Sequence, residues 1–358
     1  MLKKLGLIII SLLFSVGVFA NEHSAVSSEK QEKLNVSELI MEHIGDSYQW
    51  HIATISGHEV SMPLPVIVKS SQTGQWYIFS SSRFEHGHAT YEGFEISHSE
   101  QNKCKIVERS YDGEEVRPLD LSITKNAFSL MLNSLILVLI ILGCAKWYRS
   151  RKVEDSNPKG FVAAVEMLIM SIVDDVIKPN VGENYRKFVP YLLTIFFFIF
   201  INNVVGLIPI FPGGANITGN IAITFVLATF TFLMVNIFGT KEYWREILWP
   251  DVPWWLKFPI PLMPAIEIIG MFTKPFALMV RLFANILAGH SMVIGLTSVI
   301  FLTVGLGAAM NGVMTVVSVL MTIFIDCLEV LVAYIQAYVF TILSSVFIGL
   351  SQVKPHNH

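Results

Sequence analysis

Long apolar runs, separated by short charged segments, dominate the last two thirds of the chain. They predict membrane-spanning helices at 127–147, 189–210, 221–238, 262–304 and 311–351. About 20 apolar residues in a helix cross the hydrocarbon core of a bilayer, so each of the first three runs fits one span. The last two are much longer, which predicts strongly tilted helices. Gly305, Gly307 and Asn311 mark a turn between them, so we expect an antiparallel hairpin.

A less apolar segment, Lys159 to Asn180, lies between the first two spans. Its hydrophobic residues recur at helical spacing, but Glu166, Asp174 and Asp175 interrupt them. This pattern is typical of an amphipathic helix at the membrane surface. The predicted fold class is therefore an all-α membrane domain, 121–358, with five transmembrane helices and one interfacial helix.

The N-terminus has the pattern of a secretory signal peptide over residues 1–20. Lys3 and Lys4 precede an apolar stretch, and small residues before Asn21 suit a cleavage site. The stretch is short for a span, which favours removal, with an uncleaved anchor as the alternative. Residues 21–120 are then an exported extension.

The extension is polar, and we expect it to be small, β-containing or partly disordered. Aromatic and β-branched residues at 48–55 and 75–79 predict strands. His86 and His88 could hold a metal, but no cysteine pair accompanies them, so a solvated histidine-rich surface is the simpler interpretation. Cys104 is the one cysteine in a polar segment, and no intrachain disulfide is predicted.

Composition and charge agree with a membrane protein. The chain of 358 residues is 53% hydrophobic and 15% charged, against roughly 25% charged in soluble domains. Basic residues follow the first span, at Lys146 and Arg149, and the third, at Lys241 and Arg245. Such clusters mark cytoplasmic ends. We expect a periplasmic mature N-terminus and a cytoplasmic C-terminus in a bacterial inner membrane.

The last two helices carry polar residues at depths where such residues are expensive and usually functional. They are, in chain order, Glu267, Lys274, Arg281, Asn285, His290, Asp326, Glu329 and Gln336. A guanidinium stays charged at any accessible pH, so the role of Arg281 is the central question.

Helical spacing orders these residues by depth. Suppose Arg281 faces Gln336 in the hairpin. His290 then lies nine residues, roughly 13 Å, nearer the external turn. Glu329 lies seven residues, roughly 10 Å, nearer the same turn, so the two are a plausible proton-exchanging pair. Glu267 lies fourteen residues, roughly 21 Å, the other way. Polar groups on either side of a fixed cation outline two half-paths that do not meet.

Three separated motifs carry a resemblance to a known family. They are Lys274-Pro275 through Arg281-Leu282-Phe283-Ala284-Asn285 and Ala288-Gly289-His290; Gln336 within Tyr334 to Phe340; and Asn202-Asn203-Val204-Val205-Gly206-Leu207-Ile208-Pro209. From about Ala127 onward the chain resembles subunit a of the F-type ATP synthase.

The resemblance implies a stator subunit that does no ATP chemistry itself and needs no cofactor or metal. Its implied partners are a rotating ring of c subunits, the subunit b peripheral stalk and the lipid bilayer, with no nucleic acid. Arg281 would face the ring's carboxyl groups and block a direct proton leak, with Gln336 opposite. Asn285, His290 and Glu329 would line the external half-channel, and Glu267 would lie toward the cytoplasmic one.

The chain departs from the family pattern in three ways. His290 and Glu329 exchange the acid and histidine that the family often has, Ala284 replaces a common glycine, and the extension is long. A sodium-translocating version and a secondary ion transporter remain alternatives, although no inverted repeat is evident. A periplasmic metal-binding module is a third, supported only by the histidines.

Overall fold

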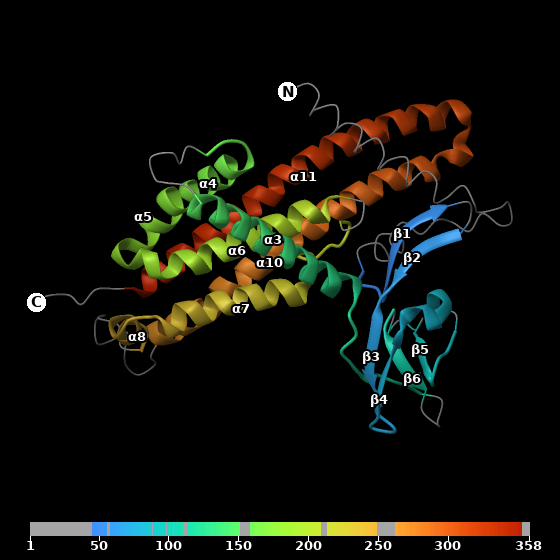
Figure 1. Cartoon of the computed structure of the whole chain (residues 1–358), viewed down its shortest axis with the longest axis horizontal. Coiled ribbons are helices and arrows are strands. Elements are labelled where there is room, and N and C mark those ends of the chain that lie inside the picture. The colour runs from blue at the N-terminus through green and yellow to red at the C-terminus, as the bar shows by residue number, and fades with distance from the viewer. Residues whose placement is uncertain are drawn as a thin grey trace, which may run out of the picture. The chain divides into compact units, whose positions relative to one another are not determined.

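A computed structural model describes residues 45–55, 58–87, 89–97, 99, 101–102, 104–109, 114–150, 158–208, 213–248 and 262–352 (Figure 1). The chain divides into two compact units. The first comprises Met1–Leu132, Val205–Ala215 and Ser291–Ile325, and the second comprises Asn133–Val204, Asn216–His290 and Asp326–His358. The predicted signal peptide, its cleavage site and His88 lie outside the described residues.

The first unit contains a domain of short antiparallel strands, which we call the N-terminal β domain. Its strands are β1 (Gln49–Ile55), β2 (His58–Pro63), β3 (Pro65–Lys69), β4 (Trp76–Ser80), β5 (Phe94–Ile96), β6 (Ile106–Arg109), β7 (Glu115–Val116) and β8 (Leu119–Asp120). They form a β1–β2 pair and two three-stranded sheets, β4-β3-β8 and β5-β6-β7. A short helix, η1 (Ser81–Gly87), follows β4. The strands predicted at 48–55 and 75–79 are thus confirmed as β1 and β4.

The N-terminal β domain has its own small core. Val66 and Val68, on one face of β3, are fully buried with Phe84 of η1, Phe94 of β5 and Ile106 of β6. The sheet β4-β3-β8 therefore packs one face against the η1–β5–β6 layer.

Main-chain hydrogen bonds join this domain to the first transmembrane helix, α3 (Lys125–Arg149). The Lys125 amide donates to the Ser47 carbonyl over 2.8 Å, and the Asn126 amide donates to Asp46 Oδ1 over 3.0 Å. A carboxylate suits a helix N-terminus, where amides lack intrahelical partners. Because these bonds lie within one unit, they fix the domain's orientation relative to the first turns of α3.

The second unit is helical. After α3 come α4 (Phe161–Ser171), a π-helical turn η3 (Ile172–Ile177), α5 (Lys178–Val181), η4 (Gly182–Asn184), α6 (Tyr185–Gly206), α7 (Ile221–Ile237) and α8 (Lys241–Leu248). Two long helices end the chain, α10 (Leu262–Leu302) and α11 (Ala308–Ser351), joined through η5 (Val304–Leu306). The predicted turn is confirmed, and Gly307 in it has a φ of 98°, which favours glycine.

Among the described residues, four helical stretches are long and apolar enough to cross a membrane: Lys125–Arg149, Phe161–Gly206, Met263–Leu302 and Ala309–Ser351. The predicted third span, α7, has 17 residues and qualifies only together with α8, from which it is bent by 100°. The prediction of five spans thus agrees with the upper end of the four to five spans found among the described residues. At 41 and 44 residues, α10 and α11 extend about 62 and 66 Å, twice the hydrocarbon thickness.

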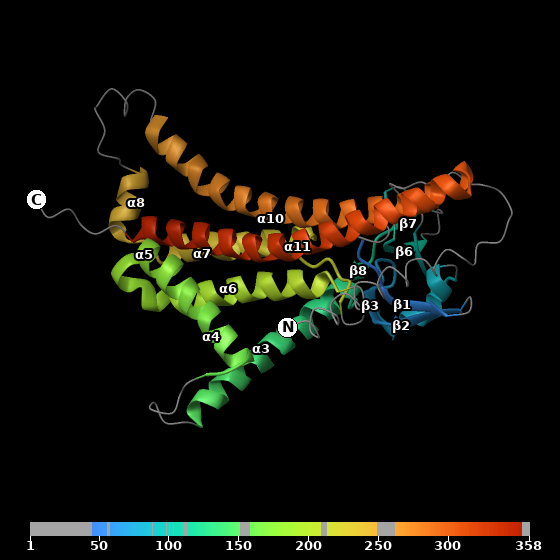
Figure 2. The same ribbon diagram turned by 90° about the horizontal axis from the view of Figure 1, so that it is seen from above.

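The interior of the second unit gathers residues from α4, η3, α6, α7, α10 and α11. Fully buried examples are Ile172 and Ile177 of η3, Leu192 and Phe196 of α6, and Phe340 of α11. The segment predicted to be interfacial therefore contributes to this core through its apolar face. In Figure 2 the first turns of α10 splay away from the end of α11.

The hydroxyl of Tyr48 offers a test of how the N-terminal β domain is held together. It donates to Asp120 Oδ2 in β8, and burial followed by this bond raises the pKa of Tyr48. Because folding raises the pKa of Tyr48, its neutral hydroxyl stabilises the folded domain in full below the unfolded pKa of about 10. This stabilisation is lost as the pH rises further. We expect Tyr48→Phe to lower the unfolding free energy by about 1–2 kcal/mol at pH 8.

The difference between the two proteins should shrink as the pH passes about 10, because only the native residue 48 can ionise. Urea unfolding, followed by a fluorophore on Cys104 with the other cysteines replaced, measures both values. An unchanged difference across this pH range would show that the Tyr48 hydroxyl does not couple ionisation to folding.

Candidate functional site

Helix α10 has two distinct faces around Arg281. Leu278, Leu282 and Ile286, spaced by four residues, are buried in the core of the second unit. Arg281 and Asn285 are exposed on the other side of the helix. Within the described residues, Arg281 makes no ion pair. A permanent charge therefore lies on a face of α10 that the described part of the chain leaves open.

The exposed face around Arg281 is lined by small side chains. Ala277, Ala284 and Ala288 lie four residues before, three after and seven after Arg281, and all three are exposed. Small residues at such spacing let another helix approach closely within a bilayer. The face suits a helical partner outside this chain.

Two contacts set the register between α10 and α11. A Cβ added at Gly289 would overlap the Glu329 carboxylate, so that side chain reaches across to the α10 backbone. Toward the other end, Lys274 Nζ lies 5.9 Å from the centre of the Phe347 ring. Arg281 is eight residues before Gly289, and Gln336 is seven after Glu329, so the two fall at nearly the same level.

The polar residues differ in how far the chain encloses them. Gln336 is buried, with 8% of its surface exposed, while Arg281 at the same level is exposed. Glu329 and His290 are half-buried, and Asp326, three residues before Glu329, is half-buried as well. The structure thus brings Glu329 next to the residue that precedes His290, and it leaves Asn285 on the open face.

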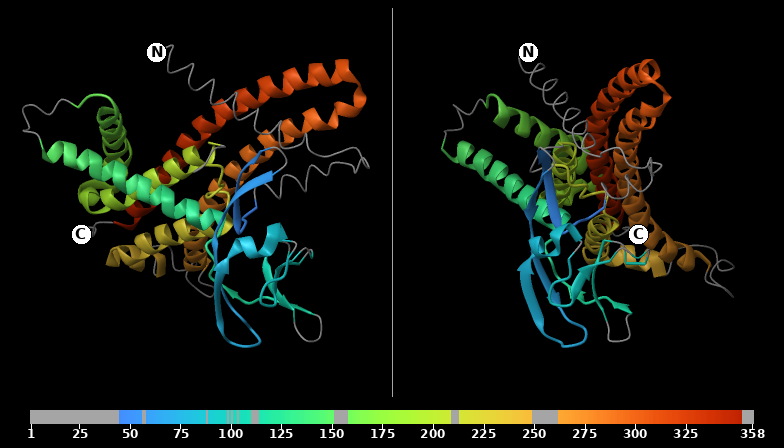
Figure 3. Two further views of the ribbon diagram at one scale, coloured as in Figure 1. Left: turned by 45° about the vertical axis from the view of Figure 1, so that its right-hand side comes forward. Right: turned by 90° about the vertical axis from the view of Figure 1, so that its right-hand side faces the viewer.

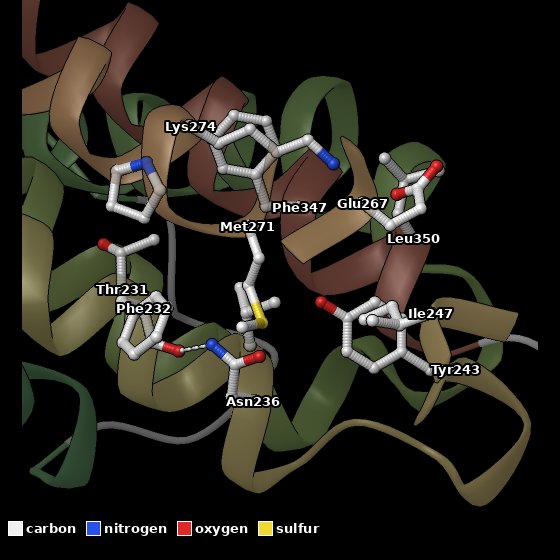
Figure 4. A pocket seen from close by; sticks show the side chains of 12 residues that line it. Thr231, Phe232, Asn236, Tyr243, Ile247, Glu267, Met271, Lys274, Phe347 and Leu350 are labelled. Atoms are coloured by element: carbon white, nitrogen blue, oxygen red, sulfur yellow. Dashed lines mark hydrogen bonds between the residues drawn. The ribbon is translucent and has the colours of Figure 1, made fainter. Parts of the chain in front are cut away.

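Glu267 lines a cavity at the splayed end of α10 (Figure 4). The cavity volume is about 40 Å³, above the ~10–15 Å³ that one ordered water needs. Figure 4 shows the Lys274 ammonium and the Glu267 carboxylate on the same side of this cavity. The Tyr243 side chain from α8 lines it too.

Asn236 of α7 completes the polar lining of this cavity. Its Nδ2 donates to the Phe232 carbonyl over 2.7 Å. Its Oδ1 is buried and has no partner among the described residues. Buried polar atoms are nearly always satisfied by protein or water, so this oxygen suits an ordered water beside Glu267.

A second polar cluster joins α3, α6 and the loop before α7, and most of it was missed in the sequence. Asn133 Nδ2 donates to Asn202 Oδ1 over 3.1 Å, and both residues are buried. The Thr218 hydroxyl donates to Asn203 Oδ1, while the Asn203 Nδ2 is buried without a partner among the described residues. An asparagine inside the first apolar run was the available signal for Asn133.

Metal ligands do not gather in the part of the chain that the structure describes. No group of three or more His, Cys, Asp or Glu side chains lies close enough there to hold an ion. The side chains of His86 and His88 are outside that part, so the metal-binding alternative stays untested.

Long apolar helices that carry a fixed charge and several polar groups define an integral membrane protein. Comparison with known proteins gives the family. Residues 130–349 match the model of the ATP synthase A chain, and residues 39–121 match a model described as a domain of unknown function. The chain belongs to the ATP synthase A chain family, whose members are membrane subunits of a larger complex rather than enzymes on their own.

Similar curated proteins agree with this. ATP synthase subunit a 2 of Chlorobaculum tepidum is 41% identical over 249 residues, covering 68% of this chain and 67% of the relative. ATP synthase subunit a of Chlorobium phaeobacteroides is 41% identical over 239 residues, 65% and 66% of the two chains. That of Myxococcus xanthus is 38% identical over 248 residues, 67% and 76% of the two chains. The matches thus span about two thirds of the first two relatives.

The contact between Gly289 and Glu329 can be tested by substitution. In Gly289→Ala the added methyl group displaces the Glu329 carboxylate, because the two occupy the same space. We expect slower ion flow in vesicles, by roughly three-fold to ten-fold, if this carboxylate passes protons. Adding Glu329→Asp, which shortens the side chain, should restore part of the loss.

Gly270→Ala is the matched control, because a Cβ at that position on the same helix meets nothing within 4 Å. Equal losses from the two glycine substitutions would mean that the effect comes from the helix backbone and not from Glu329.

Proposed function

We propose that this chain is the proton-conducting stator subunit of the membrane sector of an ATP synthase. It supplies two half-channels to a ring of c subunits, so that proton flow turns the ring and drives ATP synthesis. One observation carries the proposal. Arg281, which cannot be neutralised, lies on an exposed face of α10 without an ion pair among the described residues.

A carboxyl group on each c subunit is the proposed partner of Arg281. Beside a fixed cation in a medium of low dielectric constant, the ionised form of a carboxyl is favoured over the neutral one. The ring's carboxyl therefore releases its proton near Arg281 and takes up another after moving past it. The small residues Ala277, Ala284 and Ala288 support the close approach that this exchange needs.

The external half-channel is proposed to run through His290, Glu329 and Asn285. Glu329 contacts Gly289, the residue before His290, and this supports proton exchange between the Glu329 carboxyl group and the His290 imidazole. The buried cluster of Asn133, Asn202 and Asn203 adds hydrogen-bonding groups that can order water on an entry path. Gln336, at the level of Arg281, ends this path.

The cytoplasmic half-channel is proposed to open at the Glu267 cavity. Its carboxylate, the Lys274 ammonium and the unsatisfied Asn236 oxygen give the cavity polar groups that can hold water. Basic residues in α8, Lys241 and Arg245, support a cytoplasmic position for that end.

The same orientation places the N-terminal β domain in the periplasm, after removal of a signal peptide, and the C-terminus in the cytoplasm of a bacterial inner membrane. Subunit b of the peripheral stalk would hold the subunit against the rotation of the ring. No observation on this chain favours sodium over protons.

We expect Arg281→Ala to abolish proton-driven ATP synthesis while the subunit still assembles, because Lys274, a second exposed cation on α10, lies seven residues away, roughly 10 Å along the helix, and cannot replace the charge at the level of Gln336. ATP synthesis in sodium-free inverted vesicles measures the effect, and the amount of assembled complex is measured in parallel. Val280→Ala is the matched control, since Val280 is also exposed on α10 and uncharged. Near-normal synthesis with Arg281→Ala would remove the proposed mechanism.

We expect His290→Ala or Glu329→Ala to slow proton flow by about ten-fold, in the range of lost acid–base assistance. The exchange His290→Glu with Glu329→His keeps one acid and one imidazole at the same level and should do less harm than either loss. Passive proton flow through membranes stripped of the soluble sector gives the rates. An exchange as harmful as the single losses would mean that the two residues do not work as a pair.

A further inference from the structure

The N-terminal β domain has an apolar face that its own core does not use. Four large apolar side chains on this face are more than half exposed: Trp76 (52%), Ile78 (73%), Leu119 (55%) and Leu121 (59%). An antiparallel sheet with one solvated face normally alternates apolar and polar residues. Contiguous exposed apolar residues instead mark a surface that meets another protein or a membrane.

Strand register shows that these side chains form one patch. In sheet β4-β3-β8, Lys69 pairs with Trp76 on one side and Leu119 on the other. Ile67 pairs with Ile78, and its carbonyl accepts a hydrogen bond from the Leu121 amide over 2.9 Å. We call the patch of Ile67, Lys69, Trp76, Ile78, Leu119 and Leu121 the outer sheet face.

The outer sheet face lies on the same side of the domain as the first turns of α3. Its opposite face packs on η1, β5 and β6. In Figures 1 and 3 the β3–β4 hairpin lies on the side from which the first turns of α3 depart, with η1, β5 and β6 on the far side. The core therefore lies behind the sheet, and the outer sheet face is on the side of the first turns of α3.

Chain continuity sets the distance from the bilayer. Leu121 lies four residues before Lys125, where α3 begins. With 25 residues α3 is about 37 Å long, and the hydrocarbon core is about 30 Å thick. Its first turn thus lies among the headgroups, and the hydrogen bonds that its amides donate to Ser47 and Asp46 hold the domain at that turn.

The chemistry of the outer sheet face suits the same zone. Tryptophan is enriched at membrane interfaces, and lysine extends its ammonium toward headgroups while its stem stays in apolar surroundings. Lys69 Nζ lies 5.8 Å from the centre of the Trp76 ring, and the outward positions of these strands include no acidic residue. A basic apolar face complements anionic phospholipid.

We propose that the outer sheet face rests on the bilayer surface beside α3, with Trp76 and Ile78 inserted at the boundary between headgroups and acyl chains and Lys69 near lipid phosphates. The N-terminal β domain then lies flat on the membrane instead of standing in the aqueous phase. The occupant of this face is lipid, not a further protein.

A spin label on the full-length chain tests this. Ile78→Cys is labelled in a chain whose three native cysteines are replaced. Cys104, exposed in the connection between β5 and β6, is labelled in a second chain as the matched control. Each chain is reconstituted singly in lipid nanodiscs and, without a bilayer, in amphipathic polymer. Collision rates with oxygen and with a polar nickel chelate are then compared.

In nanodiscs the oxygen-to-nickel ratio at position 78 should be roughly ten-fold above that at position 104, because polar solutes are excluded from hydrocarbon. The excess should disappear in the polymer. Equal ratios at the two positions in nanodiscs would overturn the proposal. So would a label at position 78 shielded from both reagents, since that would mean a protein contact.

Lys69→Gln tests the headgroup contact separately. With the native Lys69, replacing phosphatidylcholine by phosphatidylglycerol in the nanodiscs should raise the ratio at position 78, and Lys69→Gln should remove this dependence. A dependence that survives Lys69→Gln would contradict the role of Lys69.

Discussion

One constraint shapes the membrane part of this protein: a guanidinium that cannot lose its proton has to reside on a helix otherwise suited to hydrocarbon. Such a charge needs a polar partner or a water-filled path. Among the described residues no ion pair forms at Arg281, and its side chain is exposed. Instead α10 buries Leu278 and Leu282 on one side and leaves Arg281 on a surface of small residues on the other. The charge of Arg281 is therefore available to a group outside the described residues.

The long pairing of α10 with α11 places polar residues at several depths on both sides of Arg281. Their lengths exceed the hydrocarbon thickness, so polar residues can be spread over more depth than one upright span allows. The register, set at Gly289 and Lys274, then assigns each polar residue a level. Glycine at 289 matters because only a residue without a side chain lets an acid from α11 reach the α10 backbone.

Sequence alone was enough for features that depend on local pattern. Spans follow from apolar runs, and the hairpin turn follows from Gly307, whose conformation suits glycine. The bend between α7 and α8, the π-helical turn at Ile172–Ile177 and the pairing of Asn133 with Asn202 were not predicted. Each depends on how distant segments pack, because a bend or an asparagine pair leaves no periodic trace in its own segment. The common level of His290 and Glu329 could be predicted because both lie on regular helices of constant rise. Their roles stay proposals.

The joint between the N-terminal β domain and α3 has a consequence for how the protein is made. Strand β8 closes the sheet against β3, more than fifty residues earlier in the chain, and α3 begins five residues after β8 ends. With the proposed orientation, the chain crosses the membrane in extended form, N-terminus first. The sheet lacks its last strand until residue 120 has emerged, by which time α3 is entering the translocation machinery. With that orientation, the sheet can close only when α3 is about to enter the membrane, so the folding of the domain and the insertion of the first helix follow each other directly.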